Sequence, residues 1–308
     1  MTNLETGEHP VVAGVDGSES ALHAVRWAAH EAARRKTSLR LVHVCHLVPV
    51  RHPRQVAPPP DYRLAVLDQG RHWLTEAEEA VRHATPNLPV TADLRDGITA
   101  DLLIEESRAA QLVVLGSRGL GGFSSLLVGS VAIALSAHGH CPIVVVRSGA
   151  AVQQAHEEGP VVAGVDGTEL SDEAVAFAFD AATARGAPLV AVHAWSDAEI
   201  AVAWAALPGT IDRDYLQARE EQVLTERIAL WRAKFPDVAV REVVVRDRPV
   251  HALLRHAAGA ALVVVGSRGR GAFTGLGLGS VSQGVLHHAE CPVAVVRTGR
   301  TEPTRPGP

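Results

Sequence analysis

The apolar residues of this 308-residue chain follow two alternating patterns, which are short unbroken runs and longer segments with a helical period. An unbroken run such as VVAGV at 11–15 is typical of a strand that is buried on both faces of a sheet. The segment 19–35 has apolar residues at helical spacing, and Ser18 before it is a favourable N-cap. These patterns predict strands at 11–15, 39–44, 90–94, 112–115 and 143–146, and helices at 19–35, 62–84, 101–109 and 131–138.

The whole pattern returns at a spacing of 150 residues. PVVAGVDGSE at 10–19 returns as PVVAGVDGTE at 160–169, and LVVLGSRGLGGF at 112–123 returns as LVVVGSRGRGAF at 262–273. A repeat of this length indicates two copies of one domain and not a solenoid. We therefore divide the chain into a first half, 1–150, and a second half, 151–308.

Strands that alternate with helices predict an α/β fold in each half, with a parallel sheet covered on both faces. Five strands joined by crossover helices give an open doubly wound sheet, which binds ligands beyond the carboxyl ends of its strands. The last strands, 143–146 and 293–296, are apolar and would be exposed sheet edges. We expect them to be covered by pairing between the two copies or between chains.

Composition and charge exclude several classes of function. The net charge is −5 and no basic block stands out, which argues against nucleic-acid binding. No apolar stretch reaches the roughly 18 residues of a membrane helix, and the polar start of the chain does not resemble a secretion signal. Cys45, Cys141 and Cys291 are too far apart for a zinc motif or a disulfide framework, and we interpret the last two as buried small residues. We expect a cytoplasmic protein.

The histidines and tryptophans suggest no stronger site. His138 and His140 precede one last strand, and His287 and His288 the other, at spacings that differ and without further ligands. We therefore expect no metal site from the protein alone. Trp195 and Trp204 are expected in the loop after the second strand of the second half, as packing residues or as a lid.

The strongest candidate for a ligand site is a glycine-rich loop after the fourth strand of each half. Glycine lets the backbone turn with positive φ and approach a ligand closely, and the N–H groups of the loop and of the following helix then attract phosphate. The loop serine and arginine can add hydrogen bonds and charge. These residues are Gly116, Ser117, Arg118, Gly119, Gly129 and Ser130 in the first half, and Gly266, Ser267, Arg268, Gly269, Gly279 and Ser280 in the second.

The alternative is that these glycines only shape a turn, although the duplicated spacing weakens that interpretation. The loop is not a Walker A motif, because no lysine precedes Ser130 or Ser280. It is not the dinucleotide-binding motif either, because the glycines of that motif follow the first strand.

An aspartate follows the first strand of each half, at Asp16 and Asp166. At the carboxyl end of that strand, its side chain would point into the ligand crevice. A carboxylate there can accept a hydrogen bond from a ribose hydroxyl or an adenine amine, or hold a divalent ion that bridges phosphates. The alternative is a helix cap or a turn residue.

Together these residues resemble the universal stress protein family. Its loop, G-x2-G-x9-G-[S/T], matches twice, its first-strand aspartate matches in both halves, and its second strand matches LVHV at 41–44 and LVAVHA at 189–194. The resemblance covers nearly the whole chain. The chain also resembles the two-domain actinobacterial members of the family in its tandem arrangement. The resemblance implies a flavodoxin-like, Rossmann-like domain in each half, with a five-stranded parallel sheet of order 3-2-1-4-5.

The resemblance also implies that each half binds ATP, with Mg²⁺ as a companion ion near the aspartate. The loop would hold the phosphates, and the backbone N–H groups of Val131 and Val281 would add contacts. Adenine and ribose would lie at the ends of the first two strands. The residues implied there are Gly14, Val15, Asp16, His43 and Val44 in the first half, and Gly164, Val165, Asp166, His193 and Ala194 in the second.

The sequence favours a binding module over an enzyme. Phosphoryl transfer needs a positioned base and charged clamps, and each site offers one arginine and one aspartate. We therefore expect no catalytic residues. We expect a nucleotide-dependent regulator of a stress response that forms a homodimer. A protein partner of unknown identity would recognise its nucleotide-bound state. The alternative is a slow ATPase or nucleotidyl-transfer enzyme of the adenine-nucleotide hydrolase-like group. A signalling receiver domain is excluded by the glycine loop and by the missing acidic and lysine positions.

Overall fold

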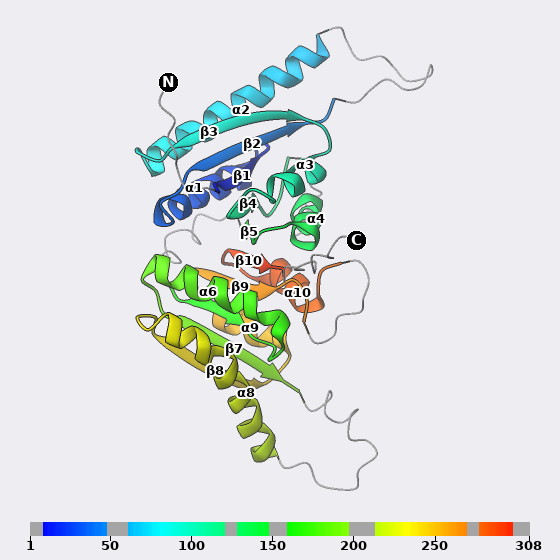
Figure 1. The fold of residues 1–308 in the computed structure, drawn as a ribbon. Helices are drawn as coiled ribbons and strands as arrows, with labels where there is room; N and C mark the ends of the chain where they lie inside the picture. Colours follow the sequence, from blue (N-terminus) through cyan, green and yellow to red (C-terminus); the bar gives the residue numbers. More distant parts are fainter. Residues whose placement is uncertain are drawn as a thin grey trace, which may run out of the picture.

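The computed structural model describes residues 9–47, 61–120, 128–147, 159–196, 213–269 and 277–297. In these ranges strands and helices alternate through both halves (Figure 1). The strands are β1 (Val11–Val15), β2 (Leu39–Cys45), β3 (Val90–Asp96), β4 (Leu112–Gly116), β5 (Ile143–Val146), β6 (Val161–Gly164), β7 (Leu189–Trp195), β8 (Val240–Arg246), β9 (Leu262–Gly266) and β10 (Val293–Val296). The helices are α1 (Glu19–Arg34), α2 (Tyr62–Ala84), α3 (Thr99–Glu106), α4 (Ser130–His138), the 3-10 helix η1 (Glu169–Ser171), α6 (Asp172–Arg185), α8 (Arg213–Lys234), α9 (Pro249–Ala257) and α10 (Ser280–His288).

The described strands form one sheet of ten, in the order β3-β2-β1-β4-β5-β10-β9-β6-β7-β8. Strands run parallel within each half, whereas β5 and β10 are antiparallel, with Val145 opposite Val293. Within each half the strands are parallel and follow the expected order 3-2-1-4-5, but the order of the sheet as a whole differs from that expectation, because the sheet is single, ten-stranded and mixed. The reason is the apolar edge: β5 and β10 are buried along their length and cover each other. The expected pairing of the last strands between the two copies is thus confirmed.

Helices cover both faces of this sheet, as Figure 1 shows. Helices α1, α2, α6 and α8 pack on one face, and α3, α4, α9 and α10 pack on the other. Alternate residues of one strand enter different cores, so Val11 and Ala13 belong to the first core and Val12 to the second. Each core contains residues of both halves, so apolar burial joins the halves as well as the layers.

The predicted elements agree with the structure to within a few residues. Ser18 caps α1 as predicted, because its Oγ accepts a hydrogen bond from Ala21 N at 3.1 Å. The largest shift is in α3, which was predicted at 101–109 and lies at Thr99–Glu106. The second half starts its first helix differently, since the short η1 precedes α6.

A buried ion cluster crosses the junction of the two halves. Glu31 of α1 is fully buried, and its two oxygens accept hydrogen bonds from Arg35 at 2.7 Å and from Arg185 of α6 at 2.6 Å. Burial by itself raises the pKa of Glu31, but Arg185 and Arg35 outweigh it and lower the pKa below its ordinary value. Arg35 also pairs with Asp180 of α6 at 2.8 Å.

Candidate functional site

The aspartate after β1 is bonded to the glycine loop. Asp16 Oδ1 accepts hydrogen bonds from Ser18 N at 3.0 Å and from Ser18 Oγ at 2.6 Å. Its other oxygen, Oδ2, accepts one from Leu120 N at 3.2 Å. In the second half, Asp166 Oδ1 accepts from Thr168 N at 2.8 Å and from Thr168 Oγ1 at 2.7 Å. Both aspartates therefore fill the turn role that was the alternative, and Asp16 also faces the loop.

The two ends of each glycine loop are closed against each other. Ser117 N donates to Val146 O at 2.8 Å, which ties the loop to the end of β5. Gly129 N donates to Ser117 O at 2.8 Å, which closes the base of the loop. The second half repeats both contacts, with Ser267 N to Val296 O at 2.7 Å and Gly279 N to Ser267 O at 2.8 Å. The same backbone geometry is therefore built twice.

Each loop leads into a helix that begins after a glycine. Helix α4 begins at Ser130 after Gly129, helix α10 begins at Ser280 after Gly279, and no described side chain caps either helix. The N–H groups of the first turn are therefore open to an anion, which the positive end of the helix dipole also attracts. Both serines are exposed, so their hydroxyls are within reach of a ligand. Residues 121–127 and 270–276 of the loops lie outside the described residues.

The second glycine of each loop lies directly against the aspartate. A Cβ on Gly119 would lie 2.4 Å from Asp16 Oδ2, and a Cβ on Gly269 would lie 2.9 Å from Asp166 Oδ2. Both distances are too short for non-bonded heavy atoms, so with a side chain at either position the carboxylate or the loop would have to shift. Gly129 has more room, with its nearest neighbour, the Ser117 oxygen, at 3.7 Å. The G-x2-G spacing therefore brings loop and aspartate together.

The second strand of each half runs past the end of the first. Strand β1 ends at Val15, opposite His43, so Val44 pairs only with β3 among the described strands. In the second half, His193 and Ala194 pair only with β8. One backbone edge of Val44 and of Ala194 therefore faces the space beyond the first strand and not another strand. These are the positions implied for adenine.

Comparison with known proteins decides the family. The model of the universal stress protein family matches residues 8–147 and again residues 159–297. This chain belongs to the universal stress protein family. Two universal stress proteins of Mycobacterium tuberculosis are 41% and 40% identical to it over 293 and 294 residues, which cover 94% of this chain and 97% of each relative. The crystal structure of a universal stress protein from Archaeoglobus fulgidus has the same fold, with a TM-score of 0.69 and 18% identity over 95% of this chain and 100% of that chain.

The two halves of this universal stress protein differ beside the second strand. His43 and His193 each place Nδ1 2.7 Å from a carbonyl oxygen at the end of the first strand, so Nδ1 carries the hydrogen. His193 Nε2 then lies 2.7 Å from Oε2 of Glu220, a residue of α8. His43 instead contacts Gly70 and the edge of Trp73.

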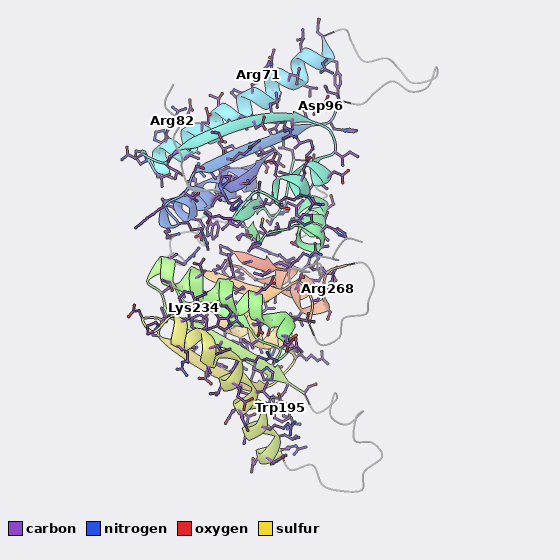
Figure 2. All side chains as sticks on the ribbon, viewed as in Figure 1. Arg71, Arg82, Asp96, Trp195, Lys234 and Arg268 are labelled. Carbon is purple, nitrogen blue, oxygen red and sulfur yellow. The ribbon has the colours of Figure 1, made fainter. Side chains whose placement is uncertain are left out.

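Trp195 is not the loop residue that the sequence suggested. It is the last residue of β7, only 3% of its surface is exposed, and its Nε1 donates to Gln217 Oε1 at 2.8 Å. Trp204 lies outside the described residues. In Figure 2, Trp195 and Arg268 lie on the same side of this universal stress protein, opposite Lys234.

Two arginines near the loops were missed in the sequence. Arg147 and Arg297 directly follow β5 and β10. Each ends a repeated segment, CPIVVVR at 141–147 and CPVAVVR at 291–297, and this repetition is the sequence signal that could have identified them. Burial and the positive charge of Arg118 lower the pKa of Arg147, and burial and the charge of Arg268 lower the pKa of Arg297. The loop arginine of each half therefore lies near the arginine that follows the last strand.

Other candidate chemistry finds little support in the described part of the chain. No group of three or more His, Cys, Asp or Glu side chains there is arranged to hold a metal ion. None of the helices described is both long and apolar enough to cross a membrane. Burial raises the pKa of Cys141 and of Cys291 to about 12, which favours our interpretation of these thiols as packed side chains.

Proposed function

We propose that this universal stress protein binds one ATP in each half and acts as a nucleotide-dependent regulator of a stress response. The observation that carries the proposal is the duplicated glycine loop, which is closed at its base and leads into a helix without a side-chain cap. Helices α2, α3, α6 and α9 also lack a side-chain cap, so what distinguishes α4 and α10 is that each follows a closed glycine loop. An anion at the helix N-terminus supplies the missing partner.

The roles of the residues follow from their places. The phosphates lie on the loop, whose base is closed by Gly129, and there Ser130 and Val131 supply N–H groups and Arg118 supplies charge. Adenine and ribose lie at the ends of β1 and β2, where Val44 presents its open backbone edge. Mg²⁺, when it accompanies the nucleotide, lies near the aspartate. The second half uses the matching residues, which are Gly164, Val165, Asp166, His193, Ala194, Gly266, Ser267, Arg268, Gly269, Gly279, Ser280 and Val281.

In this proposal 1–150 and 151–308 are two domains with one site each, held together by β5 and β10. Because these two strands already pair within the chain, a homodimer would use a different surface. The partner that reads the nucleotide state is a further protein.

We propose binding without efficient catalysis. Both oxygens of Asp16 accept hydrogen bonds from loop and turn donors, so this carboxylate is engaged in holding the loop and is a poor general base. Lys234 is at the end of α8, on the opposite side of the molecule from Arg268 (Figure 2). The charged clamp typical of phosphoryl transfer is therefore incomplete.

The test is nucleotide binding to the purified full chain. Protein prepared without added nucleotide is denatured, released nucleotides are identified by mass spectrometry, and the emptied protein is then titrated with ATP. We expect one ATP per half, and we expect Gly119→Leu and Gly269→Leu each to remove one site or to weaken it at least tenfold, about 1.4 kcal/mol. Asp68→Ala on the exposed surface of α2 is the matched control.

Each other outcome has a defined meaning. No binding of ATP at either site would overturn the proposal and leave the loop as a structural turn. ADP or AMP formed with Mg²⁺ at about one turnover per second or faster would favour the ATPase or nucleotidyl-transfer alternative. Loss of turnover in the double variant Asp16→Ala with Asp166→Ala would assign that activity to these sites.

A further inference from the structure

Each half ends in an arginine that contacts the other half. Arg147 follows β5, and its Nη2 donates to Leu286 O at 3.1 Å and to His287 O. Arg297 follows β10, and its Nη1 donates to Gly139 O at 3.0 Å. The two contacts are reciprocal, because each arginine donates to a carbonyl of the other half across the junction of β5 and β10.

The carbonyls that these arginines contact lie at the C-terminal ends of α10 and α4. The last carbonyls of a helix have no partner within the helix, and a cation there also matches the negative end of the dipole. Arg147 of the first half therefore stabilises α10, and Arg297 of the second half stabilises α4. These are the two helices whose N-termini begin at the glycine loops, at Ser280 and Ser130.

The residue before each of these arginines also accepts a hydrogen bond from the loop of its own half. Ser117 N donates to Val146 O, the residue before Arg147, and Ser267 N donates to Val296 O, the residue before Arg297. A continuous path of contacts thus runs from the first loop through Arg147 and along α10 to the second loop. A second path runs in the opposite direction through Arg297 and α4.

The electrostatics of the loops favours a response along this path. Arg118 and Arg147 repel each other, and together with burial this lowers the pKa of Arg147. Arg268 and Arg297 form the same arrangement in the second half. A phosphate on the loop would offset this repulsion. The hydrogen bonds from Arg147, or from Arg297, to the helix of the other half would then become stronger.

We propose that Arg147 and Arg297 couple the two sites, so that an anion bound on the loop of one half stabilises the helix that forms the site of the other half. The inference rests on the proposed function, because it takes the anion to be the phosphates of ATP. The coupling is positive, because each bound anion stabilises the helix of the other site, and it is reciprocal, as thermodynamic linkage requires. Arg147 and Arg297 are positioning residues, since each acts through a helix.

The experiment uses the full chain with one site disabled. Gly269→Leu places a large side chain between the loop and Asp166, since its Cβ alone would lie 2.9 Å from Asp166 Oδ2, and a titration that shows one ATP per chain establishes that only the first site fills. Amide hydrogen exchange of α10 (Ser280–His288) is then measured with and without saturating ATP. We expect ATP to slow this exchange by about fivefold or more, the lower end of typical coupling factors.

The variants separate coupling from binding. Adding Arg147→Gln should abolish the slowing in α10 while ATP still protects the loop of the first half. Arg71→Gln is the matched control, because Arg71 is exposed on α2 and pairs only with Asp68 in the described structure, and it should leave the slowing unchanged. The mirror experiment combines Gly119→Leu with Arg297→Gln and follows α4 (Ser130–His138), which keeps the proposal testable if one variant does not fold.

Two results would overturn the coupling. Slowing of α10 that persists in Arg147→Gln would show that the arginine does not carry it, and ATP bound at the first site without any slowing would show that the sites are independent. Either result leaves the proposed function intact. Absence of ATP binding in the unmodified chain would overturn the proposed function and the coupling together.

Discussion

Arg185 Nη2 lies 2.6 Å from Glu31 Oε2, and this contact joins α6 of the second half to α1 of the first. Both side chains are almost completely buried, at 3% and 0% exposure. A charge in such a place is tolerated only when partners surround it, and Glu31 has Arg35 as well as Arg185. One buried carboxylate therefore joins the two halves, in addition to the apolar cores that they share.

Glu31→Ala should destabilise the whole chain by about 3–5 kcal/mol, because it leaves Arg185 and Arg35 buried without their carboxylate. The free energy of unfolding, measured in urea by circular dichroism, checks this. Asp68→Ala, which removes an exposed carboxylate paired with Arg71, should change it by less than about 1 kcal/mol. Equal effects of the two variants would contradict the role given to Glu31.

The contribution of Glu31 to the free energy of unfolding should also decrease as the pH falls. Its pKa in the folded chain is lowered from 4.5, so the unfolded chain binds its proton first as the pH falls. The stabilisation is fully present above about pH 4.5 and is lost as the pH falls through the folded-state value. The stability difference between the unmodified chain and Glu31→Gln should therefore shrink on acidification. A difference that stays constant down to about pH 3 would argue against the ion cluster.

Gly70→Ala should lower stability, although glycine in a helix interior is usually improved by alanine by roughly 0.5–1 kcal/mol. The new Cβ would lie 2.6 Å from His43 Cδ2 and 2.7 Å from Leu94 Cδ1, so the core beside the second strand must shift. We expect a net loss of about 1–3 kcal/mol by chemical denaturation. Thr75→Ala at an exposed position of the same helix is the control, and stabilisation by Gly70→Ala would refute the packing argument.

Cys141 and Cys291 should react very slowly with iodoacetamide in the folded chain. With a pKa of about 12, only about one thiol in ten thousand is ionised at pH 8, and the thiolate is the reactive form. Mass spectrometry of cysteine-containing peptides should show complete labelling only after unfolding in urea. Rapid labelling of either residue in the folded chain would require a thiol with a much lower pKa than its burial gives.

The sequence predicted the features of the fold that arise from local patterns. Unbroken apolar runs such as 11–15 and 112–115 marked strands, because both faces of those strands are covered. The spacing of the glycines placed a loop between a strand and a helix N-terminus in each half, and the structure has both. The repeat at 150 residues then indicated that the same arrangement returns in the second half, although the 3-10 helix η1 there was not predicted.

Contacts between distant residues could not be predicted in this way. Glu31 and Arg185 are 154 residues apart, and no periodicity reveals which acid will meet which base. The partner of His193 is Glu220, on a helix that differs between the halves, so the internal repeat gave no guide. Trp195 was expected in a loop because the match to the second strand ended at Ala194, whereas the pairing of Trp195 with Arg246 of β8 extends the strand by one residue.

The antiparallel contact of β5 with β10 joins two similar units that belong to one polypeptide. In an assembly of two identical chains, this contact would dissociate on dilution, and any substitution would appear in both sites at once. Covalent linkage removes both constraints, since the partner strand is always present at a high effective concentration. The two sites can then diverge separately: Glu220 occupies one half, while the matching helix of the other half keeps Gly70 against His43. Tandem fusion thus allows one molecule to hold two different versions of the proposed site.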